Sequence, residues 1–109
     1  MKILISFPSA AMDVTAEELP AVEASSHAVV REAKAAGVWV FGGGIDESVP
    51  PVTVAGDGTV ADTAATGLDG GFTVLEVPDR AAALDWAAKF AVGCHCPQEL
   101  RVFGFDPES

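Results

Sequence analysis

The sequence is poor in basic residues, and that shortage excludes whole classes of partner. Six Lys and Arg stand against sixteen Asp and Glu, which leaves a formal net charge of −10. Such a charge repels the phosphates of nucleic acids and of anionic lipids, so we expect neither nucleic acid nor a membrane as a partner. No apolar run approaches the ~20 residues that a membrane-spanning helix requires.

Cysteine is also scarce: the chain has only Cys94 and Cys96, which flank His95. This spacing suits an intrachain disulfide poorly, so we expect reduced thiols and a cytoplasmic location. Zinc usually takes four ligands at wider spacing, and no second ligand pair exists, so small half-buried side chains fit better than a metal site. The sequence also lacks a phosphate-cradling loop and a dinucleotide-binding motif, and we expect no cofactor.

Two further absences bear on the origin of the chain. Pro8 interrupts the first apolar stretch too early for the core of a signal peptide. An alanine-rich chain without Tyr or Asn is typical of a GC-rich bacterial genome.

Half of the residues are apolar, and 109 residues suffice for one hydrophobic core. We therefore expect one domain over residues 1–109.

Runs of β-branched and aromatic residues predict four main strands, at residues 2–7, 38–41, 71–77 and 100–105. Two apolar stripes at helical spacing predict two helices, from the capping box Thr15–Glu18 to about Ala36, and from the cap Asp79 to Ala91. Gly37 and Gly93 are expected to stop these helices. Between the second and third main strands, residues 52–54 and 59–61 flank Asp57-Gly58 and predict a small hairpin arm.

This order predicts an α+β fold of the ferredoxin-like plan, β-α-β, the hairpin arm, then β-α-β. Right-handed crossovers place both helices on one face of an antiparallel sheet. The other face would leave apolar side chains exposed, because two helices cannot cover all of the aromatic residues Phe7, Trp39, Phe41, Phe103 and Phe105. We therefore expect a homodimer packed sheet against sheet.

Several segments, in this order and spacing, resemble the YCII-related (DGPF-domain) family: Met1–Ile5, His27, Ala36–Gly37, Gly42–Asp46, Gly70–Val77, Ala81–Ala87 and Glu99–Phe103. The resemblance implies a ferredoxin-like fold that pairs into a dimeric α/β barrel, and a pocket that holds a His–Asp pair. Some relatives accompany sigma factors, which implies a regulatory link. The chain departs from the family at its Asp-Gly-Pro-Phe signature, where it has Asp62-Thr-Ala-Ala-Thr-Gly.

His27 and Asp46 are the candidate catalytic residues. His27 stands in the middle of the first helix, and Asp46 follows the run Gly42–Gly44 that leaves the second strand. A carboxylate on one ring nitrogen would orient the other toward a ligand, with His27 as general acid or base. Alternatively, His27 is a surface residue between Glu23 and Arg31, and Asp46 belongs to an ordinary turn.

Arg101, in the last strand, also has two interpretations. Its guanidinium could clamp an anionic ligand, but a cross-strand pair with Glu76 or Glu99 is the simpler expectation.

Two functions of different classes follow from these residues. The first is an enzyme or binder with a small-molecule pocket at His27 and Asp46, suited to cofactor-free proton transfer such as an isomerisation or a hydrolytic step. The second is a non-catalytic protein-interaction or transcription-regulatory domain that uses its acidic surface. A domain that mainly dimerises and serves a fused or neighbouring enzyme is a third possibility.

Overall fold

A computed structural model describes all 109 residues. Its elements follow the predicted order: β1 (Lys2–Phe7), the short 3-10 helix η1 (Ser9–Ala11), α1 (Leu19–Ala35), β2 (Trp39–Gly44), β3 (Thr53–Val54), β4 (Val60–Ala61), β5 (Gly71–Glu76), α2 (Arg80–Cys94) and β6 (Glu99–Val102). No helix is both long and apolar enough to cross a membrane.

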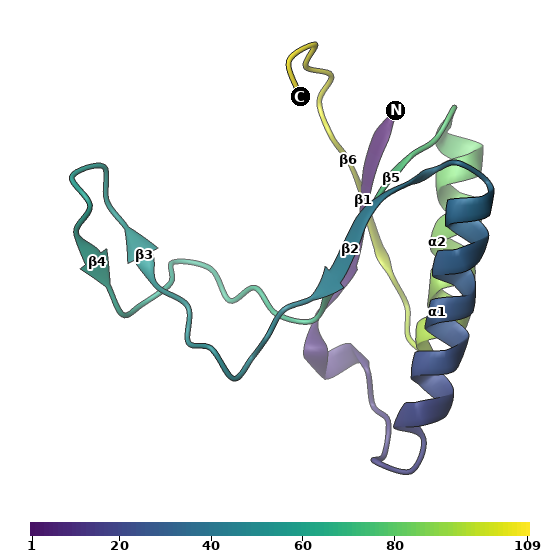
Figure 1. The fold of residues 1–109 in the computed structure, drawn as a ribbon, viewed down its shortest axis with the longest axis horizontal. Coiled ribbons are helices and arrows are strands. Elements are labelled where there is room, and N and C mark those ends of the chain that lie inside the picture. The colour runs from purple at the N-terminus through teal and green to yellow at the C-terminus, as the bar shows by residue number, and fades with distance from the viewer.

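The main sheet has the strand order β2-β5-β1-β6, and every neighbouring pair is antiparallel. Both helices lie on one side of this sheet, while β3 and β4 form a separate two-stranded arm on the other side (Figure 1). The predicted α+β ferredoxin-like fold, with its hairpin arm, is therefore confirmed.

The hydrophobic core lies between the sheet and the two helices. Ile3 and Ile5 of β1 and Leu75 of β5 are almost completely buried. Alternation along the strands puts these three side chains on the helix side, where Ile3 is paired with Leu75 across the sheet. Ala33 of α1 and Phe90 of α2 belong to the same cluster and complete the core on the helix side of the sheet. The side chains on the opposite face of the sheet are not covered by these helices (Figure 1).

Local signals at the helix ends agree with the sequence in two places, and the expected start of the first helix was wrong. The amide of Glu18 donates to the hydroxyl of Thr15 (3.2 Å), but α1 begins at Leu19 and Glu18 is its N-cap, so Thr15 does not cap the helix. Gly37 adopts the left-handed conformation, with φ +75°. Asp79 accepts a hydrogen bond from the amide of Ala82 (2.8 Å) and caps α2.

Two expectations about glycine and one about the last strand were wrong. Gly42–Gly44 belongs to β2 because it pairs in register with β5. Gly93 lies inside α2, where its missing side chain allows α1 to approach: a Cβ there would be 2.8 Å from Cγ2 of Val29. His95 instead takes the left-handed position after α2. The last strand covers residues 99–102, not 100–105.

Gly70 and Gly37 provide a matched test of close packing against backbone strain. Both have positive φ, but a Cβ at Gly70 would lie 1.9 Å from the carbonyl oxygen of Phe7, whereas one at Gly37 meets no atom within 4 Å. We expect Gly37→Ala to lower the free energy of unfolding by about 1 kcal/mol, from strain alone. Gly70→Ala should lower it by at least about 3 kcal/mol. Urea denaturation measures both, and equal losses would contradict this account of Gly70.

Candidate functional site

A cavity of about 400 Å³ lies between α1 and the β2–β5 edge of the sheet. This volume is within the range of small-molecule sites. The cavity is lined from α1, from the two strands and from the end of α2 by Phe7, Ser26, His27, Val30, Lys34, Trp39, Gly42, Gly43, Gly44, Gly71, Phe72, Thr73, Phe90, Cys94 and Gln98. The structure thus places His27 at a cavity, as the first interpretation of this residue requires.

The helical repeat explains which side chains of α1 reach the cavity. His27, Val30 and Lys34 follow the i, i+3, i+7 spacing, so they share one side of the helix. Contact with α2 sets the rotation of α1: the hydroxyl of Ser25 donates to the carbonyl oxygen of Gly93 (2.5 Å). Lys89 of α2 also pairs with Glu32 of α1, at 2.7 Å. The His27 side of α1 consequently borders the open end of the sheet.

Glycine backbone and aromatic rings form the sheet side of the cavity. The Trp39 indole lies over Gly42, where an added Cβ would be 2.5 Å from Cη2 of the ring. The Phe7 ring lies over Gly71 in the same way, at 2.6 Å from the position of a Cβ. The ammonium of Lys34 is 5.7 Å from the centroid of the Trp39 ring, within cation–π range. Rigid rings and bare backbone together keep this space free of side chains.

The structure places Asp46 apart from His27. Its carboxylate accepts hydrogen bonds from the amide and the hydroxyl of Ser48, at 3.0 and 2.6 Å. These hydrogen bonds hold the pKa of Asp46 below its ordinary value. Asp46 does not line the cavity, and no hydrogen bond or ion pair joins it to His27. The structure therefore puts Asp46 in a turn that follows β2.

The two thiols and Arg101 have structural partners. Cys94 and Cys96 are buried and not joined to each other. Burial raises the pKa of Cys94 to about 11, and the charge of Cys96 adds to this rise. Arg101 pairs with Glu99 at 3.0 Å, but both residues belong to β6, so the pair lies within one strand and not across two strands as expected. No cluster of three or more possible metal ligands is present.

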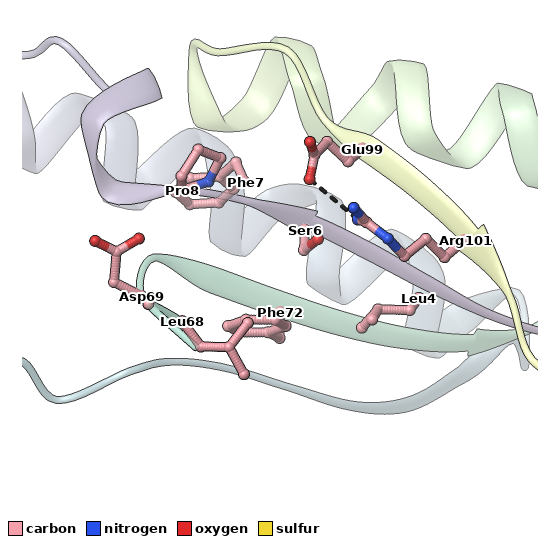
Figure 2. Close-up of a pocket in the computed structure, with 10 residues that line it drawn as sticks. Leu4, Ser6, Phe7, Pro8, Leu68, Asp69, Phe72, Glu99 and Arg101 are labelled. Atoms are coloured by element: carbon pink, nitrogen blue, oxygen red, sulfur yellow. Dashed lines mark hydrogen bonds and ion pairs between the residues drawn. The ribbon is translucent and has the colours of Figure 1, made fainter. Parts of the chain in front are cut away.

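A second cavity, also of about 400 Å³, lies on the helix-free face of the sheet. Leu4, Ser6 and Phe72 line it from the strands, and the Arg101–Glu99 pair lies at its rim (Figure 2). Leu68 and Asp69 close it from the segment that leads from the arm into β5. This cavity shares Phe7 and Phe72 with the His27 cavity but opens on the opposite side of the sheet.

Sequence reasoning did not identify Lys34 or Ser6. Lys34 could have been found, because it lies two helical turns after His27 on the same side of the predicted helix. Ser6 carried no such signal, since a single serine in an apolar strand is not distinctive. Its place at a cavity depends on how the strand packs with β5 and with the segment before it.

Fold and cavity together define a small ferredoxin-like domain with a cavity between its first helix and its sheet. The chain belongs to the YCII-related family: the model of the YCII-related domain matches residues 1–93. A search of the curated proteins found no match. The family match ends before β6, so the strand with Glu99 and Arg101 lies outside it.

The raised pKa of Cys94 predicts a thiol that reacts slowly in the folded protein. At pH 8, a pKa of about 11 in place of the ordinary 9.0 leaves about a hundredfold less thiolate. Iodoacetamide should therefore modify Cys94 at least about a hundredfold more slowly in the native chain than in urea. Mass spectrometry of the digested protein measures both rates, and similar rates would contradict the burial of this thiol.

The same shift predicts the sign of a pH effect on stability. Because folding favours the protonated thiol, this contribution is complete below pH about 9 and is lost as the pH rises toward 11.

Proposed function

We propose that this YCII-related domain binds a small organic anion in the His27 cavity, and that His27 exchanges a proton with that ligand. The observation that carries the proposal is the charge of the lining. Of the Asp, Glu, Lys, Arg and His residues of the chain, only His27 and Lys34 line the cavity. In a chain with a net charge of −10, a space bordered by basic groups and free of carboxylates favours an anion.

The remaining lining suits the body of such a ligand. Trp39, Phe72 and Phe90 offer apolar surface, while Thr73 and Gln98 add polar groups that fix orientation. The backbone at Gly44 allows a ligand to approach closely, because no Cβ stands in the way, whereas the Trp39 ring fills that space at Gly42. His27 is exposed at the edge of this space, and its ring forms no hydrogen bond with another residue. Its nitrogens are therefore available to a ligand.

Asp46 has a secondary place in this proposal. It lies two residues beyond Gly44, the end of the strand that borders the cavity, but its carboxylate is held by Ser48. A pair with His27 would form only if this turn rearranged when a ligand binds. We therefore propose His27 as the proton-exchanging residue and Asp46 as its orienting partner in the bound state.

Binding is tested with a charged probe and its neutral counterpart, benzoate and benzamide. Amide resonances of Gly42–Gly44 should shift with benzoate and respond much less to benzamide. Lys34→Ala should weaken benzoate binding by about tenfold, the usual effect of one charged hydrogen bond. Arg31→Ala is the matched control, because Arg31 is on the same helix but does not line the cavity. Equal binding of both probes, or equal effects of both variants, would refute the anion site.

Proton exchange is tested separately from binding. Pyruvate in D₂O should gain deuterium at its methyl carbon faster with the protein than without it. His27→Ala should remove at least about a hundredfold of that acceleration, a typical contribution of a general acid or base. It should leave the melting temperature unchanged, since His27 is exposed. Asp46→Asn should have a smaller effect. If the protein binds benzoate but accelerates proton exchange in no carboxylate probe, the anion site stands and the proposed proton exchange by His27 is refuted.

The homodimer is the second part of the proposed function. On the helix-free face, pairing places Arg101, Leu4, Val74 and Phe41 in one row across the four strands. Phe41 is 64% exposed in the single chain. The chain exposes 7258 Å², whereas a compact monomer of this mass exposes about 5,700 Å². This excess, about 1,600 Å², is roughly twice what one partner contributes to a standard interface.

Light scattering tests the dimer. At micromolar concentration we expect a mass near twice 11.1 kDa. Phe41→Glu should shift the population to the monomer, because it places a charge within the apolar row. Val92→Glu is a matched control on the outer side of α2, where Val92 is 77% exposed. A wild-type mass of 11.1 kDa alone would refute the dimer.

The protein-interaction alternative rests on the acidic surface and on the missing signature. A pulldown from cell extract distinguishes it, since stable recovery of one basic protein would favour this reading over ligand binding.

A further inference from the structure

The segment between β2 and β5, residues 45–70, is called the arm from here on, and the hairpin at its tip lacks support from its own chain. Its strands β3 and β4 are two residues long each and pair only with one another. Val54 and Val60 stand directly opposite each other in this pair, and they are 62% and 57% exposed. A lone two-stranded hairpin is at best marginally stable in water. The valine pair therefore needs a surface that the single chain does not offer.

Contacts at the base of the arm determine where it extends. The amide of Ile45 donates to the carbonyl oxygen of Gly70 (2.8 Å), which ties the two ends of the arm together. The amide of Ser9 donates to Asp69 (3.0 Å), and the hydroxyl of Ser9 donates to Glu47. From this anchored base the arm extends on the side of the sheet opposite the helices (Figure 1). The arm and the helix-free face therefore border the same space.

The size of the chain agrees with an interface in that space. The radius of gyration is 15.6 Å, whereas about 13 Å is expected for a compact domain of this length. The excess exposed area of about 1,600 Å² given above is enough for a standard interface and more. A second copy packed on the helix-free face would reach the arm as well as the sheet.

The cavity on the helix-free face has a mixed lining. Leu4, Phe72 and Leu68 give it apolar surface, and Ser6, Asp69 and the Arg101–Glu99 pair give it polar groups (Figure 2). An occupant with apolar side chains and backbone polar atoms, such as a β-hairpin, suits this lining.

We propose that the arm of one copy packs against the helix-free side of a second copy and clasps the dimer, with Val54 and Val60 in the contact. This inference rests on the sheet-to-sheet dimer proposed above and assigns its second contact. By symmetry each copy both gives and receives an arm, so the contact occurs twice. The segment that carries the departure from the family signature, Asp62-Thr-Ala-Ala-Thr-Gly, lies within this arm.

Sedimentation equilibrium of the full chain tests the clasp. The double variant Val54→Asp/Val60→Asp should raise the dimer dissociation constant at least about tenfold, because it places unpaired charges in an apolar contact. Val92→Asp is the matched control and should leave the constant within about twofold. In a dimer assembled from ¹³C-labelled and unlabelled copies, the Val54 and Val60 methyls should show contacts between copies.

The outcomes separate the clasp from the dimer itself. The clasp is wrong, and the sheet-to-sheet dimer stands, if the Val54→Asp/Val60→Asp variant has the dissociation constant of the wild type while Phe41→Glu raises that constant. A wild-type chain that stays monomeric overturns both. Arm methyls that contact only their own copy, or a different protein bound to the arm, overturn the clasp.

Discussion

A four-stranded sheet covered by helices on one face only is the constraint on which the rest of this structure depends. Ile3, Ile5 and Leu75 are buried because α1 and α2 lie above them. Leu4, Val74 and Phe41 lie on the opposite face of the same sheet, and no helix of the chain covers them. Because neighbouring residues of a strand face opposite sides, a strand that is apolar throughout needs two covers. One is present in the chain, and the other is the proposed second copy.

Close approach at glycine shapes the space beside that covered face. Gly93 lets α1 and α2 come together, and this contact directs the His27 side of α1 toward the sheet edge. Gly42 and Gly71 accept the rings of Trp39 and Phe7 at distances that a side chain would forbid. Gly70 turns the chain beside the Phe7 carbonyl group. The cavity is thus a product of backbone contact, and substitutions at these glycines would alter it without touching His27.

Charge is unevenly distributed in this acidic protein. The cavity between α1 and the sheet is bordered by His27 and Lys34, whereas all charged residues of the arm are acidic. Most ion pairs are exposed, including Arg101–Glu99 and Lys89–Glu32, so they contribute little to stability and mainly orient side chains. This uneven distribution is the basis of the proposed anion site, because a basic border within an acidic surface favours a small anion locally.

The sequence by itself determined the elements, their order and the ferredoxin-like topology. Strand and helix patterns, the cap Asp79 and the left-handed Gly37 act over a few residues, so they can be recognised without the fold. Glycine was where this reasoning failed: Gly93 and Gly42–Gly44 resemble stops, but here they permit close packing and strand pairing. Only the tertiary structure decided that Lys34 joins His27 at the cavity, that Asp46 bonds to Ser48, and that the arm leaves the sheet on its helix-free side. These features depend on distances between segments far apart in the chain, which are set when the helices and the sheet pack together.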